Sequence, residues 1–131
     1  MVLGFKKQFV NKIADGSKLH TIREDSKKRW KTGNKIHFAT GVRTKNYNQF
    51  KEGTCHSVQD IEIIRWSHGK FTIHIDGNTP SRNICDIAIN DGFNSIREFL
   101  DWFIPESEFD KHGVDRIDWY GRLIHWTELR Y

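Results

Sequence analysis

The sequence predicts an α+β fold with a mostly antiparallel sheet that could close into a small barrel. Strand-like spacing of apolar, β-branched and aromatic residues occurs in five segments, at residues 19–23, 35–40, 54–66, 71–75 and 122–127. Helix-like spacing or helix-end signals occur at residues 5–13, 84–90 and 95–104. A chain of 131 residues can bury one core, so residues 1–131 are expected to form a single domain.

The first helix and the first strand are separated by a glycine. The apolar residues at helical spacing are Phe5, Phe9, Val10 and Ile13. Gly16 follows them where a helix ends through a left-handed residue, a conformation that glycine adopts freely. On the strand at residues 19–23, Thr21 and Arg23 share one face because side chains alternate. Lys18 lies at the junction, where a bend could direct its side chain toward the same space.

The middle of the chain is expected to contain two strands joined by a long loop. Residues 35–40 alternate between polar and apolar, which predicts a strand. Residues 41–53 are polar and predict a long surface loop, a kind of segment that is often functional in compact domains. Residues 54–66 carry the longest strand pattern, but its spacing is irregular, so we expect a bulge or a bend near Asp60.

The second half combines a hairpin, helices and a last strand. Residues 67–70 predict the turn of a hairpin between two apolar segments. Ser95 and Glu98 have the spacing of a capping box, so a helix should begin there, and Pro105 should end it. Residues 122–127 complete the predicted sheet as a strand.

The charge of the chain is unevenly distributed. Residues 1–53 carry a formal charge of +9, and residues 54–131 carry −5, which gives +4 for the whole chain. A basic half favours contact with a polyanion such as nucleic acid, because phosphate neutralisation releases counterions. The alternative is that these charges are simply solvated.

Composition also limits the cellular setting that we expect. No segment approaches the ~18 apolar residues of a membrane span, and the chain does not begin with a signal-peptide pattern. Cys55 and Cys85 lie far apart without a C-x-x-C pair, so we expect neither a disulfide framework nor a zinc site. We therefore expect a cytoplasmic protein that does not contact a membrane.

Three residues near the first strand, together with an acid, are the candidates for chemistry. The Thr21 hydroxyl becomes a nucleophile only if a neighbour takes its proton. Lys18 can take that proton if burial or a second cation such as Arg23 lowers its pKa. Asp91 lies in a Gly-marked turn between two predicted helices and is a candidate acid. By residue type alone, the pattern favours Lys18 and Arg23 as ordinary surface charges and Thr21 as an ordinary strand residue.

The run at residues 16–23, with the turn and strand at residues 31–36, resembles the ASCH domain, a PUA-like family of small barrels associated with RNA. The hallmark of that family is Gly-x-Lys-x-x-Thr-x-Arg followed by a Gly-Asp or Gly-Asn turn. Residues 91–95 are similar to the family's acidic-Gly-Phe segment, and residues 121–126 are similar to its closing strand. The resemblance implies a mostly antiparallel β-barrel with flanking helices and a cleft lined by the motif.

One branch of that family, the bacterial acetylcytidine amidohydrolases, uses a Lys, a Thr and a Glu. The resemblance implies that Lys18 and Thr21 take the first two roles and that Arg23 assists in the cleft. It places the acid at or near Asp91, where this chain has Asp instead of Glu.

Three functions remain open from the sequence. The first is RNA or nucleotide binding, and the second is hydrolysis of an acylated nucleoside by Thr21, Lys18 and Asp91. The third is a ribonuclease in which Lys18 and Tyr47 transfer protons. The residues expected to contact RNA or substrate are Lys18, Arg23, Arg43, Lys45, Tyr47 and Lys51.

We expect RNA or a nucleoside as the partner and no cofactor. The histidines predicted to lie on or beside strands, His20, His37, His56 and His74, lack a metal-ligand spacing, so we do not expect a metal site. His125 is expected to be structural, and one of the five tryptophans could line the cleft.

Overall fold

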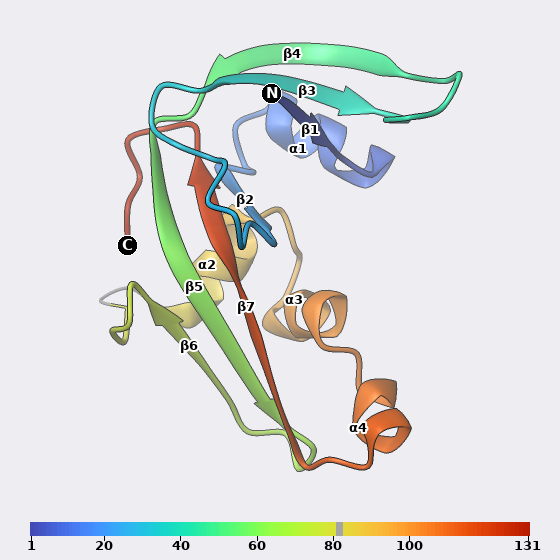
Figure 1. The fold of residues 1–131 in the computed structure, drawn as a ribbon, viewed down its shortest axis with the longest axis vertical. Coiled ribbons are helices and arrows are strands. Elements are labelled where there is room, and N and C mark those ends of the chain that lie inside the picture. Colours follow the sequence, from blue (N-terminus) through green and yellow to red (C-terminus); the bar gives the residue numbers. More distant parts are fainter. Residues whose placement is uncertain (81–82) are drawn as a thin grey trace.

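The computed structural model describes residues 1–80 and 83–131 (Figure 1). In chain order the elements are β1 (Val2–Gly4), a 3-10 turn (Lys7–Phe9), α1 (Val10–Ala14), β2 (His20–Arg23), β3 (Lys35–Thr40), β4 (Asn48–Thr54), β5 (Ser57–Trp66), β6 (Phe71–Ile75), α2 (Ile84–Asn90), α3 (Ile96–Phe103), α4 (Ser107–His112) and β7 (Arg116–His125). The predicted α+β class is therefore confirmed.

The described strands form two sheets. One has the order β1-β3-β4, and the other has the order β2-β7-β5-β6. The pairing of β1 with β3 is parallel and every other strand pairing in the two sheets is antiparallel, as the sequence predicted for most of them. The strands are hydrogen-bonded into these two sheets and not into one closed barrel.

The long pair β5 and β7 organises the larger sheet. Its register runs without a shift from Ser57 opposite His125 to Trp66 opposite Arg116. The predicted bulge near Asp60 is therefore absent from this pairing. The register shift lies instead in the pairing of β3 with β4, between Phe38 and Ala39, where Phe50 of β4 is skipped. The apolar pattern of β5 is irregular for another reason. Its buried positions recur at every second residue from Gln59 to Arg65, with Ile64 buried as well, and two of them are polar, Gln59 and Arg65.

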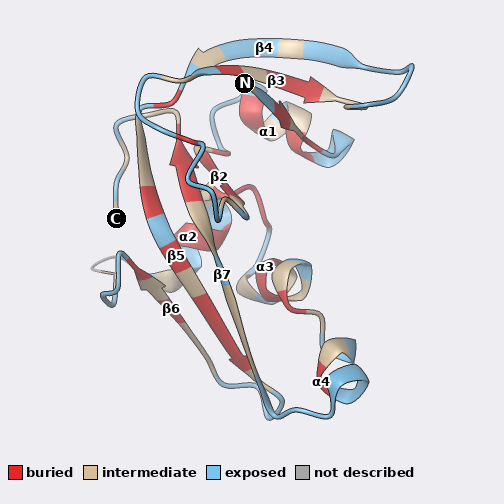
Figure 2. Cartoon of the chain, viewed as in Figure 1, coloured by how far each residue is buried: buried red, intermediate tan, exposed pale blue. Residues whose placement is uncertain are grey.

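The core lies between the sheets and under the helices (Figure 2). In the smaller sheet, Phe38 packs against Phe5 and Trp126 with ring centroids 5.8 and 5.0 Å apart. In the larger sheet, Ile63 and Leu123 are fully buried. The helices contribute further fully buried residues to this core, among them Ile87 of α2 and Phe99 of α3.

Three sequence predictions about element bounds need correction. Only the first half of residues 41–53 is a loop, because β4 begins at Asn48 and pairs with β3. This strand was missed because it is an exposed edge strand with little apolar alternation. Phe5 precedes the first helical turn instead of lying in it. The last strand begins at Arg116, six residues before the predicted start.

Other local predictions are confirmed. Gly16 has a φ of +82° just after α1. The Ser95 side chain accepts a hydrogen bond of 3.1 Å from the Glu98 backbone N–H at the start of α3. The helix ends at Phe103, two residues before Pro105. The hairpin turn lies between β5 and β6 as expected.

Arg65, near the end of β5, connects the larger sheet to the end of α3. Its Nη1 donates to Asp101 Oδ1 at 2.7 Å and to the Ile104 carbonyl at 2.8 Å, and its Nη2 donates to Glu106 Oε1 at 3.1 Å. Arg97 pairs with the same two carboxylates, but its side chain is 74% exposed. The two arginines therefore share partners and differ mainly in burial.

We predict that Arg65→Ala lowers the free energy of unfolding by about 2–4 kcal/mol, because it leaves a buried carbonyl without its donor. Arg97→Ala should cost less than about 1 kcal/mol, because its ion pairs are exposed to solvent. Urea denaturation of both variants measures the difference. Equal losses of unfolding free energy in the two variants would show that the burial of Arg65 does not determine its contribution to stability.

Candidate functional site

A cleft of about 420 Å³ runs along β2, which is an edge strand of its sheet. It collects residues from β1, the first helical region, β2, the loop after β3, the turn after α2, and α3. The lining residues are Gly4, Phe5, Lys6, Phe9, Lys18, Thr21, Ile22, Arg23, Gly41, Val42, Asp91, Phe93, Trp102 and Phe103. The four residues that the sequence proposed for the hydrolytic site, Lys18, Thr21, Arg23 and Asp91, therefore face one space.

Lys18 is the most unusual residue of the cleft, because its side chain is only 2% exposed. After the turn at Gly16, the Lys18 backbone N–H donates to the Lys12 carbonyl at 2.9 Å, which fixes the chain before β2 begins. The Lys18 ammonium donates to the Asp91 carbonyl and lies 3.5 Å from Asp91 Oδ1. It also lies 4.7 Å from the centroid of the Phe9 ring, within range of a cation–π contact.

Asp91 is placed by the end of α2. It is the residue after the last helical position, and the next residue, Gly92, has a φ of +95°. A Cβ on Gly92 would lie 3.0 Å from Lys18 Cδ and 3.0 Å from Phe9 Cδ1. Glycine is therefore required here for two reasons: the backbone turns through a left-handed conformation, and the Lys18 stem packs against it.

The burial of Lys18 changes its acid–base behaviour. Burial lowers the pKa of Lys18 from 10.5 to about 8, because a charged ammonium is poorly solvated there. Asp91 opposes this shift by attraction, and Arg23 adds to it by repulsion. A lysine in this state can lose its proton near neutral pH, as the sequence analysis required of a base.

Thr21 and Arg23 lie on the same face of β2, as predicted. Arg23 Nε donates to Thr21 Oγ1 at 3.2 Å, and Arg23 Nη2 donates to the Gly4 carbonyl at 2.6 Å. The guanidinium carbon is also 5.0 Å from the centroid of the Phe5 ring. Because Arg23 donates to the Thr21 oxygen, the Thr21 hydroxyl keeps its own proton for a different acceptor.

One wall of the cleft is aromatic. Phe9 and Phe93 are buried and pack edge to face, with ring centroids 5.5 Å apart. Trp102 of α3 contacts both rings, at 5.6 and 5.5 Å, and is 46% exposed. Of the five tryptophans, Trp102 is the one that lines this cleft.

The predicted basic loop borders the cleft, but its charged residues do not line it. Gly41 and Val42 line the cleft, and the loop continues from them toward β4. The other proposed contact residues, Arg43, Lys45, Tyr47 and Lys51, do not line it. Lys51 lies on β4, where its ammonium is 5.6 Å from the centroid of the Phe38 ring.

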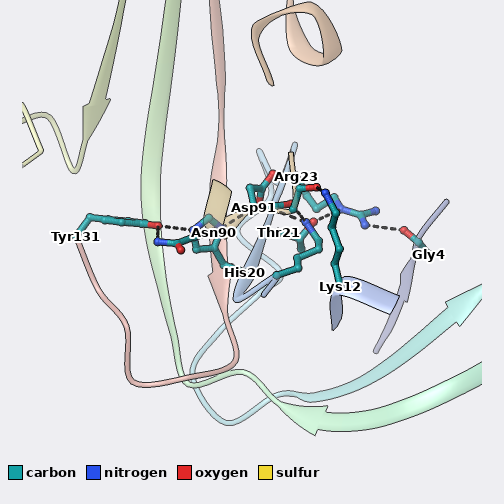
Figure 3. Close-up of polar contacts among 10 residues, drawn as sticks. Gly4, Lys12, His20, Thr21, Arg23, Asn90, Asp91 and Tyr131 are labelled. Carbon is teal, nitrogen blue, oxygen red and sulfur yellow. Dashed lines mark hydrogen bonds and ion pairs between the residues drawn. The ribbon is translucent and has the colours of Figure 1, made fainter. Parts of the chain in front are cut away.

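The sequence analysis missed a second layer of polar residues behind Asp91. His20 Nδ1 lies 2.9 Å from Asp91 Oδ1, and His20 Nε2 lies 2.6 Å from the Tyr131 hydroxyl oxygen (Figure 3). Asn90 Nδ2 donates to the same hydroxyl oxygen at 3.0 Å. The only sequence signal was the position of His20 next to Thr21, on the opposite face of β2. Nothing in the sequence connected Tyr131 to this site.

His125 is buried as a structural residue, as expected. Its Nε2 lies 3.0 Å from Gln59 Oε1, and burial lowers its pKa to about 3. Among residues 1–80 and 83–131, no group of three or more His, Cys, Asp or Glu side chains could hold a metal ion. Cys55 and Cys85 are free thiols, Cys55 buried and Cys85 exposed.

A second cleft of about 490 Å³ lies over residues of β5, β6 and β7 and the segment after β2. Its lining includes the carboxylates Glu24, Asp25, Asp60 and Glu62. None of the proposed catalytic residues lines this cleft.

We predict that the lowered pKa of Lys18 makes folding stability depend on pH. Between pH 8 and 10.5 the unfolded chain binds more protons at Lys18 than the folded chain, so the free energy of unfolding rises with pH in that window. Lys18→Met should lose this contribution, which is on the order of a few kcal/mol. Urea denaturation at several pH values measures it.

The exposed Lys111 on α4 provides the control for this measurement. Lys111→Met should follow the wild-type pH profile across the window. Identical slopes for Lys18→Met and wild type would mean that the pKa of Lys18 is not lowered in the folded protein.

Comparisons of this chain with family models, curated proteins and solved structures found no match. Within the part of the chain that the structure describes, no helix is long and apolar enough to cross a membrane.

Proposed function

We propose that the cleft along β2 binds a base of RNA or of a free nucleotide. The observation that carries this proposal is the combination of an aromatic wall with two largely buried cations, Lys18 and Arg23, in one cleft. A volume of about 420 Å³ is in the usual range for a small-molecule site. Bases stack on aromatic rings, and cations recognise phosphate and base oxygens.

Each side of the cleft has a different role in this proposal. The half-exposed ring of Trp102 offers a face for stacking at the mouth of the cleft. Arg23 keeps donors beyond those used on Thr21 and Gly4, because a guanidinium has five N–H groups. The Asp91 carboxylate accepts hydrogen bonds and can therefore face the amino group of a base.

The surroundings of the cleft favour RNA over a free nucleoside. Arg43 and Lys45 lie in the loop that continues from the cleft residues Gly41 and Val42. Residues 1–53, which include this loop and most of the cleft, carry a charge of +9. The resemblance to ASCH domains and their PUA-like barrels supports the same proposal. We also propose a cytoplasmic location, which the two free thiols fit.

A second candidate is hydrolysis of an acylated nucleoside, favoured by the lowered pKa of Lys18 beside Thr21 and Asp91. In this reaction Thr21 Oγ1 bonds to the acetyl carbon while the neutral Lys18 amine takes the hydroxyl proton. The C–N bond then breaks, and the base nitrogen leaves with that proton. Water next cleaves the threonine ester, which releases acetate and restores the hydroxyl.

A ribonuclease that uses Lys18 and Tyr47 ranks below these two. Tyr47 is half exposed and does not line the cleft that holds Lys18. Arg43 and Lys45 of the loop and Lys51 of β4 are better suited to contacting the phosphates of an RNA strand than to transferring protons.

We predict that the protein binds cytidine monophosphate and a short single-stranded RNA, and that Trp102→Leu weakens both by roughly 5- to 100-fold. The loss follows from removing the stacking face at the mouth of the cleft. Isothermal titration calorimetry measures both affinities. Trp66→Leu is the matched control, because Trp66 lies on β5 outside the cleft lining.

A variant with fewer loop charges distinguishes binding of RNA from binding of a free nucleotide, in the same experiment. Arg43→Gln with Lys45→Gln should reduce the salt dependence of RNA binding and leave binding of the monophosphate nearly unchanged. Lys70→Gln with Lys111→Gln removes the same charge elsewhere and should have little effect. Equal binding by wild type and Trp102→Leu would contradict the proposed base site.

For the hydrolytic candidate, we predict that wild type releases acetate from acetylcytidine and that Thr21→Ala and Lys18→Met each lose roughly 100-fold or more of the rate. The wild-type rate should rise as the pH increases toward 8, because the neutral amine of Lys18 is the active base. Acetate release is followed by NMR. Thr54→Ala and Lys111→Met, both outside the cleft, are the controls. Inert wild-type protein would refute this activity for acetylcytidine and leave the binding proposal standing.

A further inference from the structure

A continuous chain of polar contacts runs from Tyr131 into the cleft (Figure 3). It begins at the Tyr131 hydroxyl, passes through both ring nitrogens of His20, and reaches Asp91 Oδ1, with distances of 2.6 and 2.9 Å. Asp91 in turn contacts Lys18 through its carbonyl and its carboxylate. His20 is completely buried, and Lys18 and Asp91 are each 2% exposed.

The chemistry of these groups favours one placement of the protons. An ionised carboxylate only accepts hydrogen bonds, so His20 Nδ1 carries a proton and donates it to Asp91. Burial lowers the pKa of His20, which favours a neutral ring with Nε2 as an acceptor. The Tyr131 hydroxyl therefore donates to Nε2. Asn90 Nδ2 also donates to the Tyr131 hydroxyl oxygen, at 3.0 Å.

Tyr131 is itself held firmly against the larger sheet. The Tyr131 backbone N–H donates to Gln59 Oε1 at 2.9 Å, and Gln59 Nε2 donates to the Tyr131 carbonyl oxygen at 2.8 Å. Gln59 is a core position of β5 and is 2% exposed. A buried side chain of the sheet thus places the hydroxyl that His20 uses.

We propose that Tyr131 and His20 are positioning residues that hold the Asp91 carboxylate against Lys18. The hydroxyl selects the Nδ1–H tautomer of His20, and this N–H fixes one carboxylate oxygen of Asp91. The orientation of Asp91 in turn determines how strongly it stabilises the Lys18 ammonium. We call the chain of contacts from Tyr131 through His20 and Asp91 to Lys18 the relay. Its importance for a ligand rests on the proposed function, but the contacts themselves are present in the free protein.

Charged and aromatic groups surround both Lys18 and His20. Lys18 is influenced by Asp91, Arg23 and Lys12, and its ammonium faces the Phe5 and Phe9 rings. His20 faces Asp91, Lys18, His125 and Tyr131. Asp91 is the charged neighbour that both ends share, so a change at Tyr131 or His20 reaches Lys18 through this carboxylate.

The first test is the tautomer of His20, which long-range ¹H–¹⁵N NMR spectra of the ring report directly. We expect the Nδ1–H form in the wild-type protein at neutral pH. In Tyr131→Phe, which keeps the ring contacts and removes the hydroxyl, this preference should weaken. An Nε2–H ring in the wild-type protein would overturn the proposal, because His20 would then donate to Tyr131 and not to Asp91.

The second test is the titration of Lys18, followed by the chemical shift of its Cε in ¹³C-labelled protein. His20→Leu removes the donor to Asp91 and should lower the Lys18 midpoint by roughly one pH unit. His20→Asn keeps an N–H near the position of Nδ1 and should hold the midpoint near the wild-type value. Tyr131→Phe should shift it in the same direction as His20→Leu. Tyr120→Phe loses an exposed hydroxyl outside this cleft and is the matched control.

The outcomes separate positioning from simple packing. An unchanged Lys18 midpoint in both His20→Leu and Tyr131→Phe would overturn the proposal, as would equal shifts in His20→Asn and His20→Leu. If His20→Leu does not fold, the pair of Tyr131→Phe and His20→Asn decides the question. No ligand is used, so failure to bind a nucleotide leaves this test intact, and failure of this test leaves the base-binding proposal intact.

Discussion

The burial of the Lys18 ammonium is the constraint on which the rest of the site depends. A charged group with 2% exposure is costly unless it is paired and hydrogen-bonded. Asp91 supplies both a carboxylate and a carbonyl, and aromatic rings supply the remaining contacts. The turn at Gly92 is what allows the backbone and side chain of one residue to face the same ammonium.

This ion pair also explains why elements far apart in sequence meet here. Lys18 precedes β2, and Asp91 follows α2, 73 residues later. The two segments are joined next to the pair by a backbone hydrogen bond of 2.7 Å from Leu19 to the Asn90 carbonyl. The start of the edge strand β2 is thereby fixed to the end of α2. Further along the strand, Thr21 and Arg23 remain directed at the cleft.

The sequence predicted the parts of the site that depend on local spacing. Alternation along β2 correctly placed Thr21 and Arg23 on one face, and the Gly-marked turn pointed to Asp91, which lines the same cleft. Tyr131 was not predictable, because its contact with His20 depends on how Gln59 of β5 holds its backbone. Such a contact between distant segments leaves no periodic signal along the chain.

The errors in the predicted fold have the same origin. Gln59 and Arg65 occupy core positions of β5 because other elements satisfy their hydrogen bonds, and this made a regular strand look interrupted. The strand β4 is stabilised by its pairing with β3 and has little apolar alternation of its own. Propensity and periodicity describe one segment at a time, whereas these features depend on a partner segment.

The state of Lys18 connects the two proposed functions of the cleft. With a pKa of about 8, most molecules carry the ammonium at neutral pH, and a minority carry the neutral amine. The ammonium adds to the attraction of Arg23 for an anionic or carbonyl-bearing ligand, whereas the amine is the form that can accept a proton from Thr21. Asp91 stabilises the first form, and burial favours the second. Whatever orients Asp91 therefore sets the balance between holding a ligand and reacting with it, which is why the residues behind Asp91 matter as much as those that face the cleft.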